Sequence, residues 1–146
     1  VFYNNKYVKD NVKMPLAHGE RVFGRWEYIR YFMDNSIQVI QPDIGNAGGI
    51  TETKRICDMA YTFDVGVQIH TCASHLLTPP SVQLEACIPN FVIHEQHMRS
   101  MNPSNQELTA KVVMPKNGYL DVTDDIGIGN EWSDKALASE DQITLN

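Results

Sequence analysis

The chain has 146 residues, of which 42% are hydrophobic and 21% charged, and this is the size and composition of one ordinary globular domain rather than of a disordered or fibrous protein. Its formal net charge is −6 and it has no runs of Lys or Arg, so we expect it to bind neither nucleic acid nor an anionic membrane surface. No apolar run approaches about 18 residues and no secretory leader is evident, which predicts no membrane span and no export.

The number and spacing of the cysteines indicate a reducing compartment. The three cysteines are Cys57, Cys72 and Cys87, an odd and sparse set without CxxC spacing. We therefore expect reduced thiols in a cytoplasmic protein. Cys57 and Cys87 fall in predicted helices among apolar residues, where a buried free thiol is expected.

Two kinds of segment alternate along residues 13–98. Short apolar runs, mostly β-branched, predict strands at residues 13–18, 37–41, 65–70 and 91–95. Between them, apolar residues at helical spacing predict helices at residues 25–34, 51–64 and 81–88. In the first helix we expect the core-facing side chains to be Trp26, Ile29, Phe32 and Met33.

This alternation predicts an α/β fold with a parallel sheet. Strands that are apolar almost throughout are buried on both faces, which leaves doubly wound sheets and β/α barrels. Four strands do not close a barrel, and an open remnant would carry two unpaired edges. Because the chain also starts without Met or a helix cap, we interpret it as part of a longer protein.

The periodicity fades after Met98. Asn117-Gly118 predicts a turn, residues 110–114 are compatible with a short strand, and residues 132–138 with a last short helix. We therefore divide the chain into residues 1–98, which carry the alternation of strands and helices, and residues 99–146, a C-terminal extension.

An ionisable side chain ends each predicted strand. Glu20, Asp43, His70 and Glu95 follow one another at intervals of roughly 25 residues, close to the repeat of a β/α barrel. Because barrel chemistry takes place at the carboxyl ends of the strands, we expect these four side chains to face one mouth. Taken singly, Asp43 is equally compatible with a turn residue and His70 with a core histidine.

Together, the four residue types suit removal of a proton next to a carboxylate. Such a proton is weakly acidic, so a base needs a cation and hydrogen-bond donors placed beforehand. Glu20 is the candidate ligand of Mg²⁺, His70 the candidate base, and Asp43 the residue that orients its ring. Glu95, if protonated, could donate to a substrate carboxylate.

Four motifs in this order resemble the mandelate racemase branch of the enolase superfamily, and within it the galactonate- and galactarate-type acid-sugar dehydratases. They are GERVFGRW at residues 19–26, QPDIGNAGGITE at 41–52, VQIH at 67–70 and IPNFVIHEQ at 88–96. The resemblance implies a modified (β/α)₇β barrel with an α+β capping domain. It also implies that residues 1–98 are the C-terminal half of the barrel and that residues 99–146 pack on the barrel or on the capping domain.

The resemblance also implies a reaction. In that family three acids on consecutive strands bind Mg²⁺. The third matches Glu20, so the first two would precede Val1. An Asp–His dyad matches Asp43 and His70, and the acid of the last strand matches Glu95. Water would be lost from a hexonate or hexarate through an enediolate, giving a 2-keto-3-deoxy acid.

Other ionisable side chains lie near the predicted strand ends or in the loops that follow them. We expect Arg21 to bind a substrate carboxylate, although an ion pair with a neighbouring acid is the alternative. His97, after the last strand, is a further candidate for substrate contact. His18 and His94 are interpreted as packed or structural, and His75 lies in a loop that is able to cover the site.

Three functions remain open from the sequence. The first is a Mg²⁺-dependent acid-sugar dehydratase, of which this chain by itself is expected to be inactive. The second is a racemase or epimerase with a second base outside this chain. The third is a catalytically silent fragment. The expected partner is a small sugar acid, and the resemblance implies a homo-oligomer.

Overall fold

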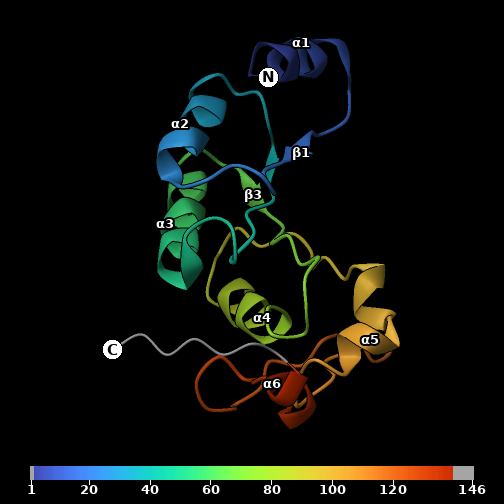
Figure 1. The fold of residues 1–146 in the computed structure, drawn as a ribbon. Helices are drawn as coiled ribbons and strands as arrows, with labels where there is room; N and C mark the ends of the chain where they lie inside the picture. Colours follow the sequence, from blue (N-terminus) through green and yellow to red (C-terminus); the bar gives the residue numbers. More distant parts are fainter. Residues whose placement is uncertain (1, 140–146) are drawn as a thin grey trace.

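A three-stranded parallel sheet organises the chain, and the computed structural model describes residues 2–139. The strands β1 (Ala17–His18), β2 (Val39–Ile40) and β3 (Gly66–Val67) lie in that order in the sheet. Helices α2 (Arg25–Met33), α3 (Gly49–Thr62) and α4 (Thr78–Ala86) follow them in turn (Figure 1). The predicted α/β class with a parallel sheet is confirmed.

The register of the sheet aligns the strands along their length. Ala17 pairs with Val39, and Ile40 pairs with Val67. The pairing continues beyond the named strands as an isolated parallel bridge between Asp43 and His70. The carboxyl ends of β2 and β3 are therefore level with one another.

The predicted strand at residues 91–95 is much shorter than expected. It is reduced to one parallel bridge between Phe91 and Val67, in which the Val92 N–H donates to the Val67 carbonyl at 2.9 Å. Within residues 2–139 no strand pairs with its other side, so hydrogen bonding does not extend it further. Phe91, Val92 and Ile93 are accordingly all exposed, by 45%, 54% and 58%.

The core lies between the sheet and helices α2 and α3. Ile40 contributes from β2, Val67 from β3, Ile69 from the segment after β3, and Ile56 and Cys57 from α3, all fully buried. Burial raises the pKa of the Cys57 thiol to about 12, so this cysteine is an inert core residue as predicted.

Predictions about buried side chains were wrong at three residues. In α2, Phe32 is buried and Ile29 packs against the core as predicted, but Trp26 and Met33 are exposed, and Tyr28 and Tyr31 are buried instead. Trp26 instead stacks against the Arg25 guanidinium, 4.6 Å from the ring centroid. Cys87, predicted to be buried, is exposed, because it follows α4 at the C-terminal cap rather than lying inside it.

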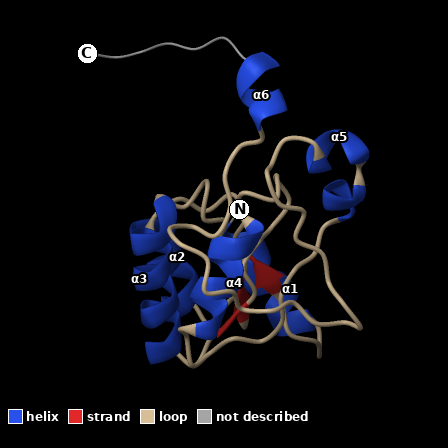
Figure 2. Ribbon diagram, turned by 90° about the horizontal axis from the view of Figure 1, so that it is seen from below, coloured by secondary structure: helices blue, strands red, loops and turns tan. Residues whose placement is uncertain are grey.

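Short elements joined by long loops make up the C-terminal segment (Figure 2). They are the 3₁₀ helix η1 (Met98–Met101), α5 (Pro103–Gln106) and α6 (Asp134–Ser139). The predicted turn is confirmed, since Lys116 pairs with Tyr119 around Asn117 and Gly118. The predicted last helix corresponds to α6, whereas residues 110–114 form no strand. The proposed extension continues to residue 146, and residues 140–146 lie outside the described part.

Helix α1 (Phe2–Asn11) was not predicted, and it lies at one end of the molecule (Figure 1). It carries little apolar periodicity, and one ion pair between Lys6 and Asp10 at 2.6 Å spans a single turn.

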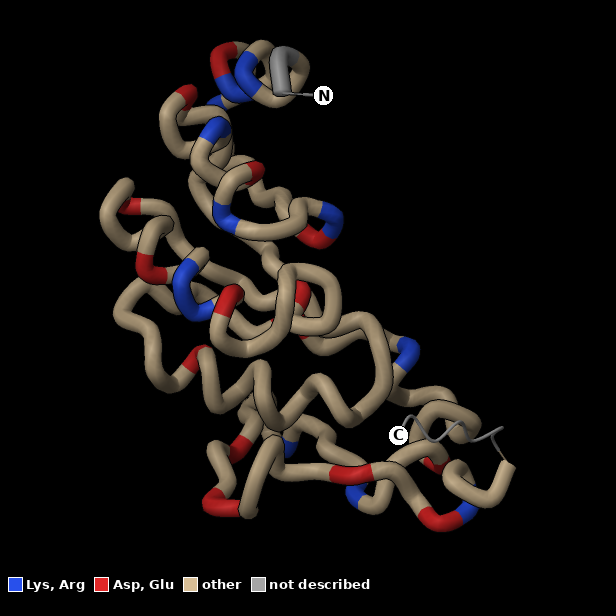
Figure 3. Tube along the Cα trace, turned by 60° about the vertical axis from the view of Figure 1, so that its left-hand side comes forward, with Lys and Arg blue, Asp and Glu red and all other residues tan. Residues whose placement is uncertain are grey.

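Charged residues are dispersed along the backbone trace (Figure 3). None of the helices in residues 2–139 has the length and hydropathy needed to cross a membrane.

Gly19 is expected to tolerate no side chain. An added Cβ would lie 2.6 Å from the Tyr28 hydroxyl and 2.9 Å from the Gln41 nitrogen, at a φ of +147°. We expect Gly19→Ala to lower the free energy of unfolding by about 2–4 kcal/mol, combining backbone strain with overpacking.

Gly118→Ala is the matched control for this substitution. Its φ is +83° and an added Cβ would meet nothing within 4 Å, so only the backbone cost of about 1 kcal/mol applies. Denaturant unfolding of both variants in the full-length protein measures the difference. Equal losses would show that the contact with Tyr28 does not constrain Gly19.

Candidate active site

Asp43 is fixed by the turn that follows β2. Its Oδ1 accepts the Asn46 N–H at 3.0 Å, and its carbonyl accepts the Ala47 N–H at 2.7 Å. The side chain is only 6% exposed. With Oδ1 held by the backbone, Oδ2 remains for a second partner. The turn thus positions the carboxylate rather than merely reversing the chain.

That second partner is His70, at the end of β3. The His70 N–H donates to the Pro42 carbonyl at 3.0 Å, and the ring Nδ1 lies 2.8 Å from Asp43 Oδ2. An ionised carboxylate only accepts hydrogen bonds, so Nδ1 carries the proton in this pair. Backbone and side-chain pairing together hold the imidazole with its Nε2 directed away from Asp43.

Glu20 reaches the other nitrogen of the ring from the loop after β1. Its Oε2 lies 3.0 Å from His70 Nε2, and its side chain is 49% exposed. Glu20 follows Gly19, whose carbonyl accepts a 2.7 Å hydrogen bond from the buried Tyr28 hydroxyl. Burial raises the pKa of Tyr28, which keeps this hydroxyl protonated and donating.

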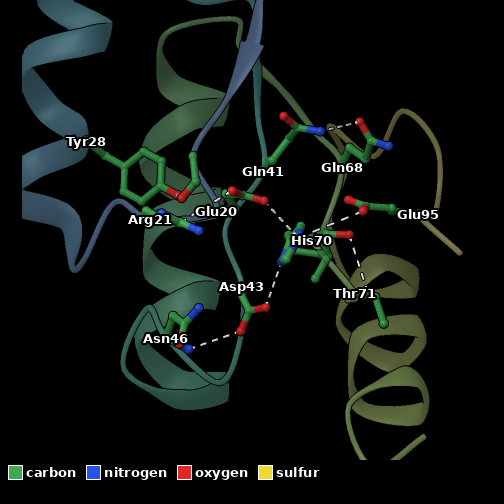
Figure 4. A network of polar contacts seen from close by, with 12 residues as sticks. Glu20, Arg21, Tyr28, Gln41, Asp43, Asn46, Gln68, His70, Thr71 and Glu95 are labelled. Atoms are coloured by element: carbon green, nitrogen blue, oxygen red, sulfur yellow. Dashed lines mark hydrogen bonds and ion pairs between the residues drawn. The ribbon is translucent and has the colours of Figure 1, made fainter. Parts of the chain in front are cut away.

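Glu95 approaches the same nitrogen from the segment after Phe91. Its Oε1 is 3.9 Å from His70 Nε2, beyond hydrogen-bond length, and its side chain is 22% exposed. Figure 4 shows Glu20, Asp43 and Glu95 arranged around His70. The structure therefore brings together all four side chains expected at the strand ends.

Gln41 and Gln68 form a second layer that the sequence did not reveal. They lie two residues before Asp43 and His70, and the Gln41 Nε2 donates to the Gln68 Oε1 at 3.0 Å (Figure 4). Side chains two residues apart on a strand share a face. The two-residue spacing was the feature of the sequence that could have indicated this pair. It places the two glutamines next to the dyad, on the side towards the strands' amino ends.

Among the described residues, Arg21 reaches this cluster only through Glu20, and His97 has no hydrogen bond or ion pair to the four side chains. The Arg21 side chain is 85% exposed and its Nε lies 3.6 Å from Glu20 Oε1, which corresponds to the alternative ion pair. His97 begins η1, where its Nδ1 accepts the Arg99 N–H at 3.1 Å. Their expected roles in substrate binding remain predictions.

His18 and His94 have structural contacts. The His18 ring packs edge-on against Tyr31, with centroids 5.5 Å apart. His94 turns towards α4, where its Nδ1 lies 2.7 Å from Glu85 Oε2. Burial raises the pKa of Glu85, and the bond to His94 only partly offsets this. The pair lies beside a groove of about 520 Å³, also lined by Val82.

The described residues do not by themselves make a metal centre. Within residues 2–139 there is no group of three or more His, Cys, Asp or Glu side chains arranged to hold a metal ion. Glu20 is one open carboxylate, and Mg²⁺ takes about six oxygen ligands in an octahedron. This chain therefore fits a Mg²⁺ site only as the donor of one ligand.

Comparison with known proteins is consistent with this geometry. A family model described as "Enolase C-terminal domain-like" matches residues 4–136. A member of the enolase superfamily from Salmonella Typhimurium superposes with a TM-score of 0.94 at 42% identity, over 99% of this chain and 37% of that chain. The chain belongs to the enolase superfamily and corresponds to the C-terminal part of its barrel.

Relatives of this chain include enzymes named as sugar-acid dehydratases. A D-galactonate dehydratase from Pectobacterium atrosepticum is 36% identical over 85 residues, which are 58% of this chain and 22% of the relative. A D-xylonate dehydratase from Haloferax volcanii is 27% identical over 124 residues, 85% of this chain and 30% of the relative. The chain thus spans about a third of their length or less. An enolase from Agrobacterium radiobacter with bound sodium and L-malate superposes at a TM-score of 0.85, with 28% identity, over 100% of this chain and 40% of that one.

The buried Glu85 predicts a pH-dependent contribution to stability. Above its ordinary pKa of 4.5 the unfolded chain releases this proton, whereas the folded chain retains it until the raised pKa is passed. The wild type should therefore lose stability relative to Glu85→Gln as pH rises from about 4.5 towards neutrality. Urea unfolding near both pH values measures this difference.

The exposed Glu131→Gln variant serves as the control, because its carboxyl group is solvated. Its difference from the wild type should change little over the same pH range. A Glu85→Gln difference that stays constant, or that favours the wild type at higher pH, contradicts the role given to burial.

Proposed function

We propose that the protein containing this chain is a Mg²⁺-dependent hydro-lyase that dehydrates a hexonate or hexarate to a 2-keto-3-deoxy acid. The observation that carries this proposal is the 2.8 Å pair between Asp43 Oδ2 and His70 Nδ1, aligned at the ends of adjacent strands. The dehydratase names of the curated relatives support the choice of reaction class.

His70 is the proposed base. With its Nδ1 proton directed to Asp43, His70 would use Nε2 to take the proton next to the substrate carboxylate, in place of the 3.0 Å contact that Nε2 makes with Glu20. Asp43 then stabilises the imidazolium that forms, because its Oδ1 is already held by the Asn46 N–H and cannot turn away. The same imidazolium is able to return a proton to the departing hydroxide.

Glu20 and Glu95 occupy the space that Nε2 faces. We propose that Glu20 supplies one oxygen ligand to Mg²⁺. The other protein ligands, and the strands and helices that complete the barrel, would come from outside this chain. Mg²⁺ bound there would supply positive charge next to the developing enediolate. Glu95, when protonated, would donate a hydrogen bond to a substrate carboxylate oxygen.

The remaining parts of the proposal concern the periphery of the site. Arg21 is exposed enough to exchange its contact with Glu20 for a substrate carboxylate. His97 follows Glu95 by two residues; its Nδ1 accepts the Arg99 N–H, and its Nε2 would contact a substrate hydroxyl. Residues 1–98 are proposed as the barrel half and residues 99–146 as an extension, in a cytoplasmic homo-oligomer.

The experiment that tests the reaction is a dehydration screen. The full-length protein with Mg²⁺ is incubated with a library of hexonates and hexarates, and 2-keto-3-deoxy product is scored. Turnover of one or two acids is the expected result. Deuterium exchange at C2 without product would instead indicate racemisation or epimerisation, and neither product nor exchange would indicate a silent protein.

His70→Asn is expected to lower kcat at least about 100-fold, because general base catalysis typically contributes this much or more. Mg²⁺ affinity should change little, since His70 is not a proposed ligand. His18→Asn is the matched control, because that ring packs on Tyr31. Near-normal turnover by His70→Asn would remove it from the mechanism.

Glu20→Gln is expected to weaken Mg²⁺ binding by about tenfold or more, because the amide oxygen carries no charge. Metal titration by calorimetry measures this directly, with Glu131→Gln as an exposed control. Unchanged affinity in Glu20→Gln would show that its carboxylate does not touch the ion.

A further inference from the structure

A second histidine lies close to the dyad in sequence but inside the protein. His75 follows His70 by five residues, in the loop between β3 and α4, and its side chain is 0% exposed. Because His75 is buried, its side chain does not cover the site, which the sequence had left open for this loop.

The hydrogen bonds of His75 define one neutral tautomer. Nε2 lies 2.9 Å from the Ser100 carbonyl oxygen, which only accepts, so Nε2 carries the proton. Nδ1 accepts the Val113 N–H at 3.3 Å, so Nδ1 carries none. The two nitrogens thus make different bonds to two segments of the C-terminal part of the chain.

Ser100 passes this anchoring on to the residues that follow Glu95. Ser100 is itself 5% exposed, and its hydroxyl donates to the His97 carbonyl at 2.6 Å. The same hydroxyl accepts a hydrogen bond from the Gln96 side chain. Residues 96, 97 and 100 are therefore tied together, and His75 ties the group to the loop after His70.

We propose that His75 is a positioning residue, which holds the segment carrying Glu95 in place against His70 through its hydrogen bond to Ser100. The argument rests on the proposed function, since it assigns the positioning to that reaction. Glu95 Oε1 is 3.9 Å from His70 Nε2, and few hydrogen bonds from β3 reach its segment. A displacement of about 1 Å at such a site is able to cost up to about 100-fold in rate.

Two substitutions separate the two bonds of His75. In His75→Gln the side-chain amide is able to donate to the Ser100 carbonyl, as Nε2 does, but the acceptor for Val113 is lost. In His75→Asn the amide oxygen is able to accept from Val113, as Nδ1 does, but the donor to Ser100 is lost. Each variant therefore loses one buried hydrogen bond, and their stabilities should be similar.

Kinetics of the full-length protein give the first readout. We expect His75→Asn to lower kcat about tenfold or more with KM within about threefold, and His75→Gln to retain kcat within about threefold. Both should have similar unfolding temperatures. Equal losses of kcat in the two variants, or losses that follow the unfolding temperature, would overturn the proposal and leave His75 a packing residue.

Amide hydrogen exchange gives a readout that does not depend on turnover. The Ser100 and Asn102 N–H groups, which donate to the His97 and Arg99 carbonyls, should exchange about tenfold faster in His75→Asn and at the wild-type rate in His75→Gln. Unchanged exchange in His75→Asn would refute the anchoring. If the wild type dehydrates no acid, the proposed reaction fails, while the exchange rates still decide the role of His75.

Discussion

The parallel pairing of Asp43 with His70 is the constraint on which the rest of the site depends. The Pro42 carbonyl and the His70 N–H join the two strands at 3.0 Å, and the side chains repeat the pairing at 2.8 Å. A shift of one residue in this register would turn either side chain to the opposite face of the sheet. The buried apolar residues of both strands pack against the helices, and this packing makes such a shift costly.

Around this pair the described residues place two further carboxylates. Glu20 and Glu95 reach His70 Nε2 from the two flanking segments, and both keep part of their surface exposed. The chain covers 37% of the Salmonella Typhimurium structure, and in the proposed function the remaining Mg²⁺ ligands come from outside it. The last bridge, next to β3, leaves the apolar residues Phe91 to Ile93 exposed.

The sequence predicted the features that depend on local pattern. Apolar periodicity located α2, α3 and α4, and the intervals between strand ends brought Glu20, Asp43, His70 and Glu95 together. Features set by tertiary neighbours were beyond it. Trp26 and Met33 have the apolar character of core residues, but the rotation of α2 against the sheet buries Tyr28 and Tyr31 instead. Likewise, nothing local marks Ser100 as the partner of a histidine 25 residues away.

The measurement that tests the central claim most directly is a double-mutant cycle on the dyad in the full-length protein. If Asp43 acts only by holding and stabilising His70, then Asp43→Asn in the His70→Asn background should cause almost no further loss of kcat. Losses that multiply in the double variant would contradict the account, because the two residues would then act independently.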